Sequence, residues 1–264
     1  MFSIHIRPLL WSIILTFLFL ETNGQEFRIH SHNDYLRHLP FWEAASAKAM
    51  SIEVDVILLR DTLFVAHEKE SITSKRTFEN MYLEPLRLSS AMSFSLNPSL
   101  QLLVDCKTEA NATLALIIKK CEIYKKFLYH PETGKGVKVI ISGNRPPASD
   151  YNNSPPYLFF DHQSIDDLDK ISFEKIGMVS LPFYKFVRWN GKDTIPAVEK
   201  EKVLKITQSV HKYKVPFRFW ATPDTPEAWK MLPELGIDFI NTDQPIRVSE
   251  YLKTNSKQPT SQQK

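Results

Sequence analysis

Glycine and cysteine are scarce in this chain, and each scarcity excludes a class of function. The 264 residues include 7 glycines and 2 cysteines, and no segment matches the nucleotide-binding loops GxxxxGK or GxGxxG. The motifs GxSxG, HExxH and CxxC of serine hydrolases, zinc proteases and thioredoxins are also missing. We therefore expect no nucleotide cofactor held by such loops. Two cysteines are too few for a disulfide scaffold, so Cys106 and Cys121 are expected to be buried thiols, with a single bridge as the alternative.

A strong charge of either sign is also lacking. The chain has 33 basic and 30 acidic side chains, for a net charge of +3, and no basic run accompanies this balance. Nucleic acid is therefore not expected as a partner. Because 43% of the residues are hydrophobic, the chain can bury one sizeable core, and its length fits one α/β barrel or two smaller domains.

The one long apolar run lies at the N-terminus. Leu9–Leu20 is almost wholly apolar, follows Arg7 and precedes a polar end at Glu21–Gly24. This run is shorter than the ~20 residues that span a bilayer, although an uncleaved anchor is the alternative. We predict a signal peptide over residues 1–24 and hence export to a periplasmic or extracellular location. A single domain then covers residues 25–253, and the polar residues 254–264 form a disordered tail.

Short runs rich in β-branched and aromatic residues alternate with helical patterns along the rest of the chain. Helices are predicted at Phe41–Met50, Ala112–Leu128, Val198–Tyr213 and Thr225–Leu235, and an extra strand at Leu63–His67. The alternation predicts an irregular (β/α)8 TIM barrel, with an open doubly wound sheet as the alternative. The eight predicted barrel strands are Phe27–His30, Ser51–Leu59, Leu100–Lys107, Lys138–Ser142, Tyr157–Asp161, Met178–Phe183, Phe217–Ala221 and Asp238–Thr242.

Acidic residues on two of these strands predict a metal site. Glu53 and Asp55 are two positions apart, so both side chains lie on one face of their strand. Two neighbouring carboxylates inside a barrel are costly, and a hard cation such as Mg²⁺ or Ca²⁺ would relieve that cost. Asp105 is expected to be a third ligand, and Lys107 a cation near a substrate phosphate. The alternative is an exposed edge strand, but Ile52–Leu59 is too apolar for that.

Two histidines are predicted to flank the metal site. His32 and His67 each follow a strand close to the carboxylates, and imidazole titrates near neutral pH, as general acid–base catalysis requires. His30 is two residues before His32 and shares its strand face, so either side chain can point into the pocket.

The order of these motifs resembles that of the PLC-like phosphodiesterase superfamily. The motifs are His32-Asn33, Glu53-x-Asp55, His67 and Asp105-x-Lys107, followed by Phe219–Thr222 and Leu235–Pro245, which resemble the last two strands of glycerophosphodiester phosphodiesterases. The superfamily also includes phosphatidylinositol-specific phospholipases C and sphingomyelinase D. The likeness covers residues 27 to 252.

The resemblance implies a (β/α)8 barrel with one Mg²⁺ or Ca²⁺ ion. His32 and His67 would then be the catalytic pair, and Glu53, Asp55 and Asp105 the metal ligands. The chain departs from the usual glycerophosphodiesterase pattern in two ways. His32-Asn33-Asp34 replaces His-Arg-Gly, which loses a phosphate-binding arginine. His-Asn is instead similar to the eukaryotic phospholipases C, in which the asparagine is a metal ligand, so this resemblance makes Asn33 a candidate metal ligand. The third carboxylate is Asp105, as in sphingomyelinase D, rather than a glutamate.

The function predicted from these features is metal-dependent cleavage of a glycerophosphodiester or phospholipid-type phosphodiester. Lys107, Arg145 and Lys185 could offset phosphate charge, and Trp220 could stack on a substrate group. The aromatic residues around Tyr184 could contact a membrane surface, or they could pack in the core. A secreted, catalytically inactive binding protein on the same barrel is the alternative. Glycoside hydrolysis fits less well, because it needs carboxylates ~5 to 9.5 Å apart on opposite sides of a sugar.

Overall fold

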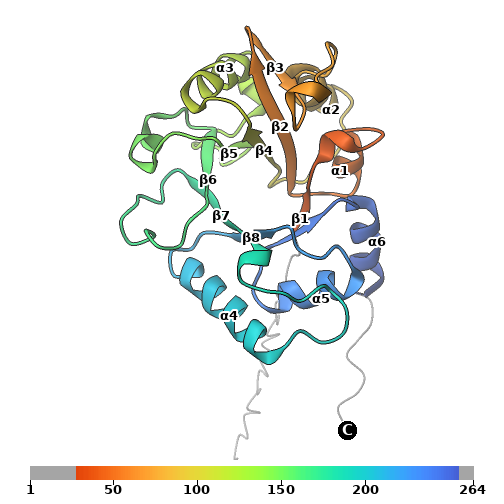
Figure 1. Ribbon diagram of the computed structural model, residues 1–264. Helices are drawn as coiled ribbons and strands as arrows, with labels where there is room; N and C mark the ends of the chain where they lie inside the picture. Colours follow the sequence, from red (N-terminus) through yellow and green to blue (C-terminus); the bar gives the residue numbers. More distant parts are fainter. Residues whose placement is uncertain (1–27, 256–264) are drawn as a thin grey trace, which may run out of the picture.

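The computed structural model describes residues 28–255, which form a nearly closed barrel with helices around it (Figure 1). Eight parallel strands follow the order β8-β7-β6-β5-β4-β2-β1-β9, and the short strand β3 pairs antiparallel with β2. The strands are β1 (Arg28–Ser31), β2 (Ser51–Leu59), β3 (Thr62–Val65), β4 (Gln101–Cys106), β5 (Lys138–Gly143), β6 (Leu158–His162), β7 (Ile176–Pro182), β8 (Phe217–Trp220) and β9 (Phe239–Thr242).

The two ends of this strand order come together. The Asp238 N–H just before β9 donates to the Phe217 carbonyl of β8 at 3.0 Å, so the last two strands lie side by side. The prediction of a TIM barrel is therefore confirmed, including the extra strand that folds back on β2. The open doubly wound sheet is excluded.

Each of the four predicted helices overlaps a helix of the structure. The helices are α1 (Trp42–Ser46), α2 (Glu84–Ala91), α3 (Ala110–Ile123), α4 (Ala197–His211), α5 (Pro226–Glu234) and α6 (Pro245–Asn255). The helices α2 and α6 were not predicted, and α2 continues directly from a π-helical turn at Glu79–Leu83. Because α6 runs to Asn255, it includes the first two residues of the predicted tail. The predicted signal peptide and the remainder of that tail lie outside the described residues.

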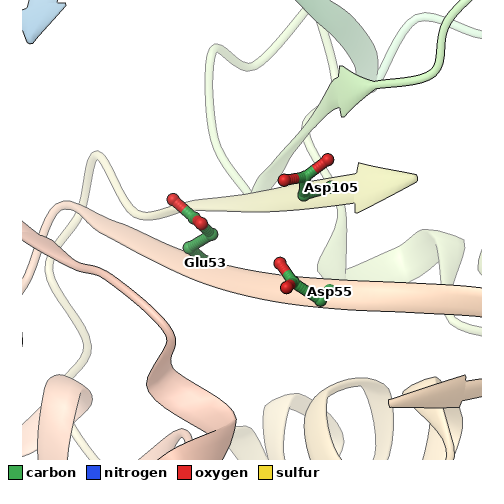
Figure 2. A group of neighbouring side chains, drawn as sticks. All are labelled: Glu53, Asp55 and Asp105. Carbon is green, nitrogen blue, oxygen red and sulfur yellow. The ribbon is translucent and has the colours of Figure 1, made fainter. Parts of the chain in front are cut away.

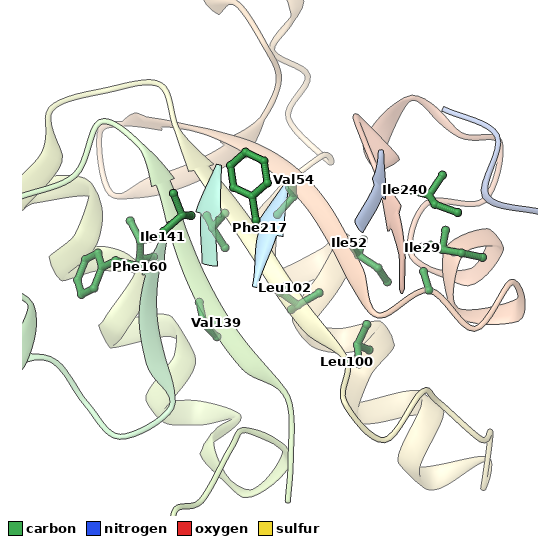
Figure 3. Close-up of a cluster of buried hydrophobic side chains, with 14 of the residues drawn as sticks. Ile29, Ile52, Val54, Leu100, Leu102, Val139, Ile141, Phe160, Phe217 and Ile240 are labelled. Atoms are coloured by element: carbon green, nitrogen blue, oxygen red, sulfur yellow. The ribbon is translucent and has the colours of Figure 1, made fainter. Parts of the chain in front are cut away.

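The outward faces of the strands pack beneath the helices. Ile52 and Val54 of β2, Leu102 of β4, and Val139 and Ile141 of β5 are each fully buried in one large apolar cluster (Figure 3). β2 lies between β1 and β4, so it is not an exposed edge strand. Burying this face of β2 requires the alternate residues, including the acidic ones, to point into the barrel.

The inside of the barrel is apolar at its lower end, where the strands begin, and polar at its upper end, where the strands finish. The lower end is filled by a separate buried cluster of Met50, Leu103, Ile140, Met178 and Phe239. Four of them are followed two positions later, on the same strand face, by a polar residue: Asp105 after Leu103, Ser142 after Ile140, Ser180 after Met178 and Asn241 after Phe239. The apolar cluster therefore closes the barrel beneath a polar site at the carboxyl ends of the strands, where TIM barrels carry their active sites.

Both cysteines are buried and free, as predicted. Burial raises the pKa of the Cys121 thiol to about 12, so it is not a nucleophile at neutral pH. Within residues 28–255, no helix combines the length and the apolar character needed to cross a membrane.

Candidate active site

Three carboxylates converge at the upper end of the barrel. Glu53 and Asp55 extend from β2, and Asp105 extends from the neighbouring strand β4 toward them (Figure 2). Asp55 pairs with Asp105 in the parallel register, and one ligand atom from each of the three lies within 4.8 Å of the others. Glu53 and Asp55 are buried, and the side chain of Asp105 is 21% exposed. The structure thus brings the three predicted ligands together.

One oxygen of Glu53 is held by cationic and polar neighbours. Its Oε2 accepts from Nε2 of His30 at 2.8 Å and from Nη1 of Arg218 at 2.8 Å. The other ring nitrogen of His30, Nδ1, lies 2.7 Å from the Ser51 hydroxyl. Arg218 also contacts His30 directly and donates to Oδ1 of Asn241 at 3.2 Å. These contacts fix the orientation of the Glu53 carboxylate.

Asp55 and Asp105 are also each held through a single oxygen. Oδ2 of Asp55 accepts from the Tyr35 hydroxyl at 2.9 Å, from Nδ1 of His67 at 2.7 Å and from the Lys107 ammonium at 3.1 Å. Lys107 lies 2.8 Å from Oδ2 of Asp105 as well. One lysine therefore bridges both aspartates from one side.

The second oxygen of Asp55 lacks a donor. Oδ1 of Asp55 is buried and accepts no hydrogen bond from any residue of the described chain. Oε1 of Glu53 lies 3.9 Å from Nε2 of His32, beyond hydrogen-bond distance. A buried oxygen without a partner needs a cation or a donor, and three hard oxygen donors suit Mg²⁺ or Ca²⁺. The donor set therefore fits the expected cation.

Cationic and polar neighbours keep Glu53 ionised. Although burial alone would raise the pKa of Glu53, the Arg218 guanidinium and the His30 hydrogen bond hold that pKa well below its usual range. Burial and the Arg218 charge lower the pKa of His30 to about 3, so His30 is neutral. Burial raises the pKa of Asp105, and Lys107 opposes this shift.

The two predicted catalytic histidines approach the cluster from different elements. Nδ1 of His32, after β1, lies 3.0 Å from Oδ1 of Asp243, which leaves Nε2 on the side of Glu53. Burial works against the charged ring, but the Asp243 hydrogen bond and the Glu53 charge raise the pKa of His32 above its usual value. His67 follows β3 and is 62% exposed. His30, left open by the sequence, is fully buried and bound to Glu53, so His32 and His67 are the histidines that face the cavity.

A cavity of about 600 Å³ lies over the cluster. Lys107, Trp220 and Asn33 line it, as do Arg218 and both predicted catalytic histidines. Arg145 and Lys185 do not line it. Arg145 instead donates to the Tyr151 hydroxyl and the Gly143 carbonyl, and Lys185 is exposed in the turn after β7.

No role was predicted from the sequence for Arg218, Tyr35 or Asp243. Arg218 precedes Trp220 by two residues on β8 and shares its strand face, which is the signal that could have placed it in the barrel. The Tyr35 hydroxyl also lies 3.1 Å from Oδ1 of Asn33, and so its single proton is shared between the candidate ligand Asn33 and the Asp55 carboxylate. The cavity therefore contains an arginine, although the chain lacks the one that follows the first histidine in glycerophosphodiesterases.

Comparison with known proteins agrees with this arrangement. Residues 20–92 match the AIM6-like phosphodiesterase domain. That segment contains His32, Asn33, Glu53, Asp55 and His67. The resemblance to phosphodiesterases, expected from the motifs, is therefore confirmed over this segment.

Curated relatives and solved structures extend the likeness over most of the chain. The altered inheritance of mitochondria protein 6 homolog of Arthroderma benhamiae is 25% identical over 81% of this chain and 80% of its own length. Its counterpart from Eremothecium gossypii is 24% identical over 85% and 69%. A glycerophosphodiester phosphodiesterase from Parabacteroides distasonis shares the fold at a TM-score of 0.60 and 15% identity, over 88% of this chain and 99% of that one. An Oleispira antarctica phosphodiesterase, solved with its product sn-glycerol-3-phosphate, has a TM-score of 0.53 and 10% identity, over 86% and 96%.

The names of the relatives correct one prediction from the sequence. The N-terminal apolar run suggested export, but the relatives are called altered inheritance of mitochondria proteins, which points to a mitochondrial rather than a secreted role. The run itself lies outside the described residues. A short apolar segment after a single positive charge was therefore not sufficient to assign a secreted location.

Proposed function

We propose that this protein is a divalent-metal-dependent phosphodiesterase whose substrate is a glycerophosphodiester or a phospholipid-type phosphodiester. We place the catalytic domain at residues 25–253. The observation that carries the proposal is the set of three converging carboxylates, each held through one oxygen, at the floor of a cavity lined by His32 and His67.

The charges of the site suit a phosphodiester. Glu53, Asp55 and Asp105 oppose the cations of Lys107 and Arg218, which leaves one excess negative charge. A bound dication reverses that sign and makes the site attractive to a monoanionic phosphodiester. Bound Mg²⁺ or Ca²⁺ would polarise a phosphoryl oxygen and stabilise the charge that develops on it.

The residues of the chain would hold the cation and move the protons. The Glu53, Asp55 and Asp105 carboxylates, with the Asn33 amide oxygen, would be its ligands, and Lys107 would offset phosphate charge. One of His32 and His67 would accept the proton of the attacking hydroxyl, from water or from the substrate. The other would donate a proton to the leaving oxygen. Trp220, at the cavity wall, would contact the organic group of the substrate.

Turnover of phosphodiesters by the purified protein tests this proposal. Bis(p-nitrophenyl) phosphate and a panel of glycerophosphodiesters would be assayed after EDTA treatment and again after addition of Mg²⁺ or Ca²⁺. We expect hydrolysis only with the metal. His32→Ala and His67→Ala should each lower turnover by ~10²-fold or more with an unchanged circular dichroism spectrum. His130→Ala, at an exposed position outside the cavity, is the control and should keep full activity.

Two results would reject the proposal. Hydrolysis that persists in EDTA would exclude the metal, and near-normal turnover in both histidine variants would exclude the proton-transfer pair. Metal binding without turnover of any phosphodiester would favour the inactive binding protein.

A further inference from the structure

A further buried acid, outside the carboxylate cluster, lies at the polar end of the barrel. Asp161 lies near the end of β6 and is fully buried. In the sheet, β6 is separated from β4 and its Asp105 by β5 alone. Asp161 therefore belongs to the same polar end of the barrel but is not one of the three clustered carboxylates.

Asp161 has neutral partners only. Its Oδ2 accepts from the hydroxyls of Ser142 at 2.8 Å and Ser180 at 2.7 Å, and lies 3.4 Å from Nε2 of Gln163. No lysine, arginine or histidine within residues 28–255 forms an ion pair with it. Its Oδ1 is buried without any hydrogen-bond partner among the described residues. A buried carboxylate oxygen left in this state costs free energy, which a ligand donor would recover.

The partners of Asp161 connect it to the cavity. Ser142 and Gln163 both line the cavity, and Nε2 of Gln163 donates to the Ser142 hydroxyl at 3.0 Å. Gln163 is exposed, so its side chain can move aside without disturbing the core. A substrate group that displaces it would reach the buried acid.

We infer that Asp161, with Ser142 and Gln163, is the subsite for the headgroup of the phosphodiester and selects headgroups that donate hydrogen bonds. The inference rests on the proposed function, since it extends the same cavity. A carboxylate only accepts hydrogen bonds, so an ammonium or a hydroxyl satisfies Oδ1, and an alkyl group leaves it unpaired. Such a site rejects ligands that lack the donor, because its own polar group then stays buried and unpaired.

Equilibrium binding tests the inference independently of turnover. The parent protein would carry His32→Ala and His67→Ala, to prevent cleavage, with Mg²⁺ present. The ligands would be p-nitrophenyl phosphodiesters with a propyl, 3-hydroxypropyl or 3-aminopropyl group, whose nitrophenyl end offers no donor. By calorimetry, we expect the donor-bearing esters to bind about tenfold or more tightly than the propyl ester. A comparison of the 3-hydroxypropyl ester with the 3-aminopropyl ester identifies which donor the site prefers.

Asp161→Asn should abolish this preference without changing the affinity for the propyl ester, and Gln163→Ala should change the preference without affecting folding. The matched control is Asp167→Asn. The Asp167 carboxylate lies in the loop after β6 and pairs with His162, so this variant should retain the preference. An unchanged preference in folded Asp161→Asn would overturn the inference. If that variant does not fold, an unchanged preference in Gln163→Ala would overturn it. Failure of the intact protein to hydrolyse any ester would reject the proposed function alone.

Discussion

Glu53 carries a buried negative charge whose compensation comes from the far side of the barrel. Arg218 is 3% exposed and binds the carboxylate from β8, while His30 binds it from β1. Removing one partner of a buried ion pair leaves an uncompensated charge, whereas removing both partners is often nearly neutral. The Arg218 guanidinium is therefore expected to matter for stability as well as for orienting Glu53.

Arg218→Met tests this role. We expect the single substitution to lower the free energy of unfolding by about 3 to 5 kcal/mol, because Glu53 stays buried without its cation. The double variant Arg218→Met/Glu53→Gln removes both charges and should recover most of that loss. Urea denaturation of the three proteins measures both changes. A single variant as stable as the parent, or a double variant no better than the single one, would show that the pair is not coupled as described.

At the scale of elements, the end of β5 shapes the carboxylate cluster through a glycine. Gly143 has a φ of +66°, and a Cβ at this position would overlap Oδ1 of Asp105 and the Cys106 carbonyl. Glycine is the residue that tolerates both the left-handed backbone and the close approach. The strand end therefore depends on the absence of a side chain to leave room for the third carboxylate.

Gly143→Ala is expected to weaken the affinity for the cation as well as the fold, because Asp105 must shift. Gly134→Ala is the matched control, since Gly134 has a similar φ of +64° but open space around its Cβ position. The control should lose only the conformational term of about 1 to 2 kcal/mol and bind the cation normally. Urea denaturation and calorimetric metal titration of both variants separate the two effects. Equal metal affinity in Gly143→Ala and the parent would contradict this account of β5.

At the scale of the whole molecule, the barrel was predictable because its strands are buried on both faces. Parallel strands of this kind appear as compact apolar runs, and each predicted run overlaps one of the eight barrel strands. The carboxylates were predictable for a related reason: Glu53 and Asp55 interrupt such a run with the two-residue spacing of a single face.

The contacts around the carboxylates were not predictable in the same way. Arg218 is 165 residues from Glu53 in sequence, and it meets Glu53 only because β8 and β9 close the barrel next to β1. Tyr35 and Asp243 likewise act through contacts across the end of the barrel. His32 and Asp243, for example, are in contact although they are 211 residues apart in sequence. A local pattern identifies the residues of one strand face, but the closure of the barrel decides which faces meet.

The central claim is that Glu53, Asp55 and Asp105 together hold one divalent cation, and calorimetric titration of EDTA-treated protein with Mg²⁺ or Ca²⁺ tests it most directly. We predict one ion bound per chain, with binding lost in Asp55→Asn and Asp105→Asn and kept in Asp166→Asn, which alters an exposed carboxylate outside the cavity. An intact protein that binds neither ion, or cluster variants that bind as tightly as the intact protein, would contradict the account.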